Sequence, residues 1–218
     1  MGKQVFGKNV KLTLQETIKP EDTALIIVDM QNDFCSEKGH YDRCGKDITL
    51  SKKMTPNLAK LIRKARERGV LLIYVQNTQL PNGAYLSPAA VATLLKRWGD
   101  ESELSYTLEG TWGHQVIDAI KPEPTDLTVK KHRPSAFVGT DLDLILRGSG
   151  ISTIIVTGVV TEGCVESTAR DGWLRDYYVV IAEDCIGSSV PDLHEAQLKL
   201  MKHLYHFVVP SEDLMRAW

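Results

Sequence analysis

The chain has 218 residues, of which 43% are hydrophobic and 25% are charged. This is the composition of an ordinary globular domain, and it excludes a disordered tail, a collagen-like repeat and a pure coiled coil. Lysine and arginine number 26 and aspartate and glutamate 28, which gives a net charge of −2 and no overall basic field. We therefore expect neither nucleic acid nor a membrane among the partners.

The four cysteines form no C-x-x-C pair, and they are too sparse for a disulfide framework. Their spacing does not suggest a zinc site. The N-terminal segment has no apolar signal core, and the longest apolar runs are too short to span a bilayer. These features predict a cytoplasmic protein with reduced thiols. The length fits one domain over residues 1–218, in which residues 1–20 form an N-terminal extension.

Short apolar runs alternate with amphipathic segments along the chain. Continuous β-branched runs are typical of strands buried on both faces, and apolar residues at three- and four-residue spacing indicate helices. In chain order we expect strands at 24–28, 70–75, 126–130, 154–157, 178–182 and 207–209, and helices at 51–69, 88–97, 112–120, 141–147, 162–175 and 192–203. This alternation predicts a three-layer α/β/α fold with a mainly parallel, six-stranded sheet of Rossmann-like topology.

Residues 79–112 are less regular and contain many turn formers, among them Pro81, Gly83 and Gly99. Apart from the short helix, we expect a long loop here. Long loops in compact domains often carry function, so we assign this region to the active site or to an oligomer contact. Trp112 lies at its end and is within reach of the mouth of a site, but core packing is the more frequent role of a tryptophan.

Three reactive side chains stand at the ends of predicted strands. Asp29 follows the first strand, Lys131 follows the third, and Cys164 follows the fourth after a connection that contains glycine. Each alone has an ordinary explanation: a turn aspartate, a solvated lysine and a buried, inert cysteine. Ligands of such sheets bind outside the carboxyl ends of the strands, so the three side chains are expected to share one site.

Cys164 falls at the first turn of a predicted helix, where free N–H groups and the helix dipole would lower the pKa of a thiol and hold an oxyanion. A nucleophilic cysteine also needs a group that takes its proton. None of the histidines fits that role: His114, His194, His203 and His206 fall on predicted helices, His40 in a loop, and His132 would point away from Lys131. An Asp–Lys–Cys set is a workable substitute, in which the carboxylate accepts the proton and the ammonium holds the thiolate.

Three segments of the chain, residues 24–34, 131–137 and 157–165, resemble the isochorismatase-like cysteine hydrolases in order and approximate spacing. The resemblance covers about residues 22–210. It implies a catalytic triad of Asp29, Lys131 and Cys164. It also implies a cis peptide bond between Val159 and Val160, and an oxyanion hole made by the N–H groups of Val160 and Cys164. Homodimers or homotetramers are expected from the same resemblance.

Nicotinamidases of this superfamily bind a metal through an Asp-x-His pair and a further histidine. Residues 42–60 contain no Asp-x-His, and residues 76–82 contain no histidine. We therefore expect no metal and no cofactor. Isochorismatases proper cleave a vinyl ether without a cysteine nucleophile, so Cys164 favours C–N cleavage. Residues 76–77, 110–112 and 164–172 are similar to ureido and carbamoyl amidohydrolases, and residues 33–41 to biuret-type hydrolases.

The resemblance thus implies a metal-independent cysteine amidohydrolase that acts on a small amide or ureido compound, forms a thioester on Cys164 and releases ammonia. Phe34 is expected as an apolar wall of the substrate pocket and Asn77 as a hydrogen-bonding residue, although core packing and a turn explain them equally well. Two alternatives stay open. One is a vinyl-ether hydrolase, which would need a basic pocket that the sequence does not make obvious. The other is a catalytically idle binding or scaffold protein.

Overall fold

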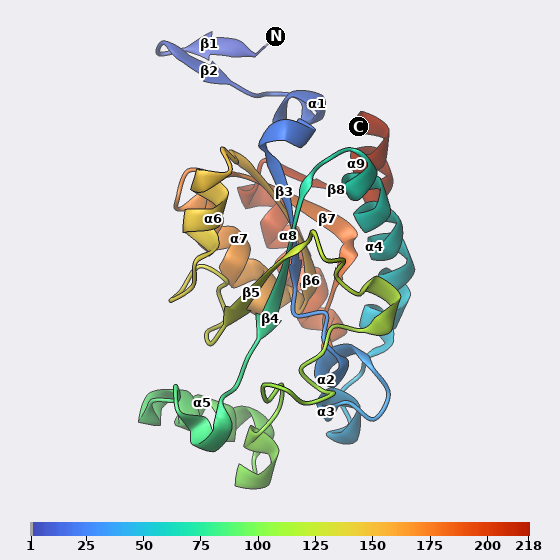
Figure 1. The fold of residues 1–218 in the computed structure, drawn as a ribbon, viewed down its shortest axis with the longest axis vertical. Coiled ribbons are helices and arrows are strands. Elements are labelled where there is room, and N and C mark those ends of the chain that lie inside the picture. The colour runs from blue at the N-terminus through green and yellow to red at the C-terminus, as the bar shows by residue number, and fades with distance from the viewer. Residues whose placement is uncertain (1) are drawn as a thin grey trace.

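The computed structural model describes residues 2–218, and its centre is a parallel sheet with helices on both faces (Figure 1). The sheet has six strands in the order β5-β4-β3-β6-β7-β8. In chain order these are β3 (Thr23–Val28), β4 (Leu71–Asn77), β5 (Leu127–Lys131), β6 (Thr153–Val159), β7 (Tyr178–Gly187) and β8 (Phe207–Val209). Every neighbouring pair in this sheet is parallel. The predicted α/β fold with a mainly parallel, six-stranded sheet is confirmed.

Two hydrophobic cores cover the sheet, which explains why its central strands are continuously apolar. Within β3, Leu25 and Ile27 face one core, whereas Ala24, Ile26 and Val28 face the other. The first core includes α4 (Thr49–Glu67) and α9 (Ser211–Ala217), and the second includes α6 (Leu142–Gly148), α7 (Glu166–Trp173) and α8 (Pro191–Leu204). The long predicted helices and all six predicted strands therefore have counterparts close to their expected bounds.

Several short elements have no counterpart in the predictions. They are β1 (Lys3–Val5), β2 (Lys8–Val10), α1 (Leu14–Thr17), α2 (Asn32–Cys35), α3 (His40–Arg43), α9, and the 3-10 turns η1 (Pro20–Asp22), η2 (Pro81–Gly83) and η3 (Glu101–Leu104). Apart from α9, which has seven residues, these elements have three or four residues and are too short for hydrophobic periodicity to develop. A further 3-10 turn, η4 (Asp118–Ile120), lies within a predicted helix. A π-type turn, η5 (Thr161–Val165), separates β6 from α7 where one helix was expected.

The predicted helix over residues 112–120 is wrong, because only η4 at its end is helical. The preceding backbone is instead held by the segment that follows β3. Gln31 Nε2 donates to the His114 carbonyl at 2.8 Å, and Asn32 Nδ2 donates to the Trp112 carbonyl at 2.9 Å. These bonds take up carbonyl groups that a helix would have used for its own ladder. Trp112 is half exposed, so its expected core packing is also wrong.

The irregular region between β4 and β5 contains α5 (Pro88–Trp98), close to the predicted helix over 88–97. Figure 1 shows α5 beyond the ends of β3 and β4, on the same side of the sheet as α2 and α3. That side is where the parallel strands end, and it is the edge at which ligands of such sheets bind.

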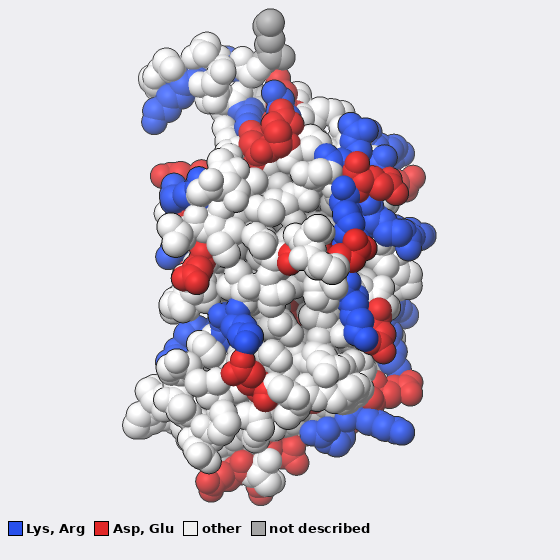
Figure 2. All heavy atoms as spheres, viewed as in Figure 1, with Lys and Arg blue, Asp and Glu red and all other residues white. Residues whose placement is uncertain are grey.

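Surface charge is of mixed sign. Figure 2 shows basic and acidic side chains next to one another along the edge formed by α4. Arg66 of that helix contacts Glu123 at 3.0 Å and Asp126 at 2.6 Å, which neutralises part of its basic face. Within residues 2–218, no helix combines the length and the apolar character that crossing a membrane would require.

Gly158 offers a test of how β6 packs against β3. Its φ is +107°, and a Cβ atom there would lie 2.0 Å from the carbonyl oxygen of Val28. We expect Gly158→Ala to lower the free energy of unfolding by about 3 kcal/mol or more, since both the clash and the backbone angle oppose a side chain. Urea unfolding measures the change.

Gly148→Ala is the matched control, because a Cβ at the end of α6 meets no atom within 4 Å. Its effect should stay within about 1 kcal/mol. Equal destabilisation by the two substitutions would contradict the close approach of β6 to β3.

Candidate active site

The structure brings Asp29, Lys131 and Cys164 together at the carboxyl ends of the sheet strands. Asp29 directly follows β3, Lys131 is the last residue of β5, and Cys164 lies in η5 after β6. Since β4 lies between β5 and β3, the Lys131 side chain crosses the end of β4 to reach Asp29. All three predicted members of the cluster thus meet, although they are far apart in the chain.

The Lys131 ammonium is the centre of this cluster. Its Nζ lies 2.8 Å from Asp29 Oδ2, 3.2 Å from Cys164 Sγ and 3.2 Å from the Arg133 carbonyl oxygen. An ammonium group has three N–H donors, and each of them has one acceptor here. Lys131 is 0% exposed and Asp29 1%, so this is a buried ion pair whose donors are all satisfied.

Backbone contacts fix the position of Asp29. Its φ is +53°, in the left-handed region that aspartate tolerates better than most residues. The Asp29 N–H donates to the Val75 carbonyl at 2.9 Å, and Oδ1 accepts from the Asn77 N–H at 2.9 Å. Asp29 is therefore tied to β4 through its backbone and through its side chain, which leaves Oδ2 to Lys131.

Burial dominates the protonation of the cluster. It raises the pKa of the Asp29 carboxyl above its usual value, against the opposing charge of Lys131. Burial also raises the pKa of the Cys164 thiol to about 12, with Lys131 opposing and Asp29 adding to the rise. Burial lowers the Lys131 pKa, but the charges of Asp29 and Cys164 outweigh that effect and hold it above its usual value.

This result corrects the expectation that a helix terminus lowers the Cys164 pKa. Cys164 lies in the short turn η5 and not in the first turn of a long helix, and burial is the largest cause of the raised thiol pKa. At neutral pH the thiol is protonated at rest, so a nearby base is required for attack. The raised pKa of Asp29 makes its carboxylate a stronger base for that purpose.

Backbone geometry near Cys164 bears on the expected oxyanion hole. The peptide bond between Val159 and Val160 is cis, at the position where the family resemblance implies one. The Val160 carbonyl accepts hydrogen bonds from the N–H groups of Gly163 and Val165. Both Val160 and Cys164 line the cavity described next. An oxyanion hole made by their N–H groups remains a prediction.

A cavity of about 350 Å³ lies between the strand ends and α5. Asp29, Cys164 and Val160 line it from the sheet, and Phe34, Tyr41 and Tyr106 form an aromatic wall. Phe34 packs edge-on against Tyr41 and Tyr106, with ring centroids 5.1 and 5.9 Å away. The volume of the cavity suits a small organic molecule, and its aromatic lining suits an uncharged, planar portion of that molecule.

The two expected pocket residues, Phe34 and Asn77, both line the cavity, whereas Trp112 does not. Asn77 also serves the protein itself, because its Nδ2 donates to Thr107 Oγ1 at 2.7 Å and its N–H donates to Asp29. Contact of either residue with a substrate remains a prediction.

Sequence reasoning missed three nitrogen-bearing side chains of the cavity, those of Arg97, His132 and Arg133. His132 was expected to point away from Lys131, yet the loop after β5 turns it towards the cavity, with Nδ1 2.7 Å from the Thr78 carbonyl oxygen. Arg133 donates to the carbonyl groups of His132 and Tyr85 at 2.6 and 2.9 Å. Arg97 is itself an exposed residue, and no local pattern distinguishes it from the other exposed residues of α5. The position of that helix beyond the strand ends brings Arg97 to the cavity.

Comparison with known proteins settles the family. A sequence model described as "Isochorismatase domain" matches residues 23–213. The chain belongs to the isochorismatase family. The expected resemblance is thereby confirmed.

Curated relatives of this isochorismatase-family chain include two proteins named ureidoacrylate amidohydrolase RutB. The one from Enterobacter sp. (strain 638) is 37% identical over 183 residues, which cover 81% of this chain and 80% of the relative. The one from Agrobacterium fabrum (strain C58 / ATCC 33970) is 34% identical over 207 residues, 90% of each chain. The expected similarity to ureido amidohydrolases is confirmed at the level of relatives.

Solved structures agree with this assignment. A cysteine hydrolase from Pseudomonas syringae pv. phaseolicola 1448A superimposes with a TM-score of 0.79 and 27% identity, over 92% of this chain and 94% of that one. N-carbamoylsarcosine amidase from Thermoplasma acidophilum gives a TM-score of 0.68 and 28% identity, over 88% and 97%. The chain is an enzyme of the hydrolase class.

The charge arrangement of the cluster predicts how Asp29→Asn changes the thiol. The carboxylate charge of Asp29 and its hydrogen bond both raise the Cys164 pKa, while Lys131 lowers it. Removing the carboxylate charge should therefore lower that pKa, so that alkylation of Cys164 by iodoacetamide reaches half its maximal rate at a lower pH than in wild type.

Peptide mapping by mass spectrometry assigns the label to Cys164 rather than to the half-buried Cys44. The same variant should lose activity although its thiol ionises more readily, because the base is gone. If the pH of half-maximal alkylation instead rises in Asp29→Asn, the carboxylate of Asp29 is not a negative charge that acts on the Cys164 thiol.

Proposed function

We propose that the chain is a cysteine amidohydrolase that cleaves a C–N bond of a small ureido or N-carbamoyl compound, by chemistry that needs no metal. The observation that carries the proposal is the contact of a thiol, a carboxylate and an ammonium, those of Cys164, Asp29 and Lys131. Cys164 and Asp29 line one small cavity, and the buried Lys131 lies behind them. The names of two relatives, ureidoacrylate amidohydrolase and N-carbamoylsarcosine amidase, support this reaction class.

In the first stage, Asp29 accepts the proton of the Cys164 thiol as sulfur attacks the carbonyl carbon of the substrate. Lys131 holds the developing thiolate and the carboxylate next to each other, since its ammonium contacts both. The carbonyl π electrons move to oxygen and form a tetrahedral oxyanion. The N–H groups of Val160 and Cys164 are the donors proposed to hold it.

In the second stage, the oxyanion collapses and breaks the C–N bond. Protonated Asp29 gives its proton to the leaving nitrogen, which departs as ammonia when the terminal amide is cleaved, and the acyl group stays on sulfur as a thioester. Asp29, again a carboxylate, then takes a proton from water as the water oxygen attacks the thioester carbonyl. Collapse of this second intermediate returns the proton to sulfur and releases a carbamic acid or a carboxylic acid.

Arg97 bears on which charged group the substrate has beside the bond that is cleaved. It lines the cavity from α5, and within residues 2–218 its guanidinium has no carboxylate partner. Its charge opposes the rise in pKa that burial causes at Tyr41 and Tyr106, which are aromatic wall residues. A carboxylate of the substrate would pair with this cation, so we infer that the preferred substrates are ureido or N-carbamoyl acids.

Ammonia release tests the reaction. Wild type should release ammonia from members of a panel of primary amides and N-carbamoyl compounds, and Cys164→Ala should lower the rate by at least about 10⁴-fold because no other group replaces the nucleophile. Mass spectrometry of the wild type during turnover should find the acyl group on Cys164.

Silence of both proteins across the panel would reject the amidohydrolase. Hydrolysis of a vinyl ether by both proteins would instead favour the alternative ether hydrolase, and binding without turnover would favour a scaffold protein.

The role of Arg97 has a separate readout. Arg97→Gln should raise KM for an N-carbamoyl acid by about 10- to 100-fold and leave kcat little changed, since a charge-assisted hydrogen bond to a bound carboxylate contributes about 1.5–3 kcal/mol. For a neutral amide of similar size, KM should not change.

Lys96→Gln is the control, because Lys96 is an exposed cation on the same helix that does not line the cavity. An equal rise of KM for acidic and neutral substrates in Arg97→Gln would rule out carboxylate recognition by this residue.

A further inference from the structure

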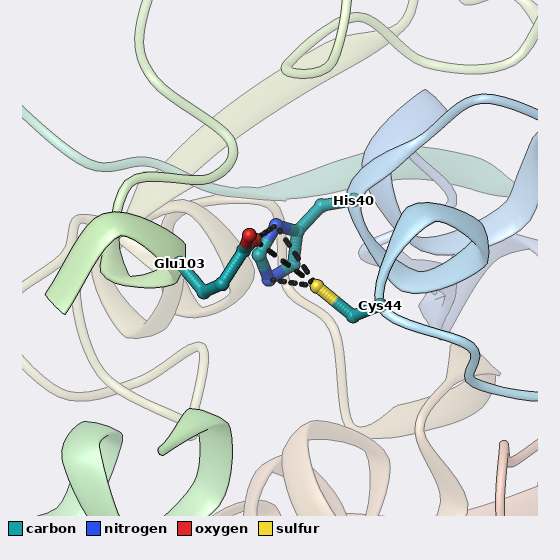
Figure 3. Close-up of side chains that lie close together, drawn as sticks. All are labelled: His40, Cys44 and Glu103. Atoms are coloured by element: carbon teal, nitrogen blue, oxygen red, sulfur yellow. Dashed lines mark hydrogen bonds and ion pairs between the residues drawn. The ribbon is translucent and has the colours of Figure 1, made fainter. Parts of the chain in front are cut away.

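We propose that His40, Cys44 and Glu103 form a binding site for zinc or a similar late first-row divalent metal ion (Figure 3). Figure 3 shows the three side chains pointing toward one another, with His40 and Cys44 coming from one segment and Glu103 from another. None of them lines the catalytic cavity, so this site is separate from the proposed reaction. The ion would hold two segments of the chain together and would not touch the reacting atoms.

The distances fit one shared ion. Cys44 Sγ lies 3.2 Å from Glu103 Oε2, His40 Nδ1 lies 3.6 Å from the same oxygen, and Sγ lies 3.9 Å from Nδ1. In a tetrahedral zinc site, bonds of about 2.0–2.3 Å separate neighbouring ligand atoms by about 3.3–3.6 Å. The two separations from Glu103 Oε2 lie within about 0.1 Å of that range. Cys44 Sγ is about as far from His40 Nε2, at 3.8 Å, as from Nδ1, so the Cys44 side chain has to rotate to share an ion with one ring nitrogen.

The spacing along the chain explains how two of the ligands meet. His40 begins α3, Cys44 follows its last residue, and the Cys44 N–H donates to the His40 carbonyl at 3.0 Å. This is the i,i+4 arrangement, which presents two side chains on the same face of a helical turn. Glu103 of η3 then supplies the third ligand from a distant part of the sequence.

The imidazole is fixed in position before any ion arrives. The His40 ring is stacked on Tyr106 with centroids 4.8 Å apart, and Trp98 meets its edge at 4.4 Å. A neutral imidazole has a lone pair on one ring nitrogen, which an ion can bind. Because the packing already orients the ring, metal binding would require little further ordering of this side chain.

The protonation states give a balanced binding reaction. In the protein alone, the Cys44 thiol donates a hydrogen bond to Glu103 Oε2 at 3.2 Å and keeps its proton. A divalent ion M²⁺ would form an S–M bond and displace this proton to solvent, with the electron pair of the S–H bond staying on sulfur. The two positive charges of the ion are then matched by one thiolate and one carboxylate.

The ligand types select the metal. Thiolate and imidazole are poor ligands for Mg²⁺ and Ca²⁺, which prefer oxygen, and suit Zn²⁺, Co²⁺ and their neighbours. The Glu103 side chain is 43% exposed, so water can occupy the fourth position. The consequence for the enzyme is mechanical: the ion would fix η3 against α3, next to Tyr106, which stacks on His40 and also lines the catalytic cavity.

Cobalt(II) is the probe for this site. Protein stripped of metal by a chelator and titrated with Co²⁺ should develop a thiolate-to-cobalt charge-transfer band together with the visible bands of four-coordinate cobalt, and Zn²⁺ should remove both. Cys44→Ala should abolish the charge-transfer band. Cys164→Ala is the matched control and should keep it, because the active-site thiol is not a ligand. Absence of the band in wild type, or its loss in Cys164→Ala alone, would overturn the proposal.

A second measurement tests the carboxylate and the proton. Calorimetric titration of wild type with Zn²⁺ in two buffers of different ionisation enthalpy should give about one proton released per ion near neutral pH. Glu103→Gln, an exposed and isosteric change, should weaken zinc binding about tenfold or more. Unchanged affinity in Glu103→Gln and Cys44→Ala would mean that zinc binds elsewhere and that the three-residue site is wrong.

Discussion

The buried ion pair between Lys131 and Asp29 is the constraint on which the rest of the site depends. Removing two charges from water is costly, and a pair of this kind adds little to stability unless every donor finds an acceptor. The Lys131 ammonium meets this condition through Asp29, Cys164 and the Arg133 carbonyl. The pair therefore holds the cluster at a fixed charge, with one movable proton shared between a carboxylate and a thiol that are both poorly solvated.

The parallel sheet is what makes that arrangement possible. The strands β5, β4, β3 and β6 are neighbours in the sheet, and all four end at the same edge. Residues that follow these strands therefore meet there, although they come from distant parts of the chain. The close approach of Gly158 to Val28 and the left-handed backbone of Asp29 both occur at this edge. Their geometry is compatible with few other residues, so we expect substitutions at these two positions of the edge to be poorly tolerated.

Local sequence patterns predicted the strands and the residues at their ends. They did not predict features that depend on contacts between distant parts of the chain. The β-branched run at residues 24–28 predicted β3, and the rule that ligands bind at strand ends correctly grouped Asp29, Lys131 and Cys164. Residues 112–117 look helical by their local pattern but are held by Gln31 and Asn32, about eighty positions away in the chain. Likewise, burial of the Cys164 thiol and the position of Arg97 at the cavity depend on packing that no local pattern contains.

The proposed reaction and the proposed substrate recognition would reside on different parts of the fold. Asp29 and Cys164 stand just after strand ends, whereas Phe34 of α2 and residues of α5 supply walls of the cavity. Tyr106 links these walls to the cluster of His40, Cys44 and Glu103, because it stacks on His40 and faces the cavity. An ion at that cluster would thus act on substrate fit through Tyr106. It would leave the shared proton of the triad alone, since the charge there is set by the three contacts of Lys131.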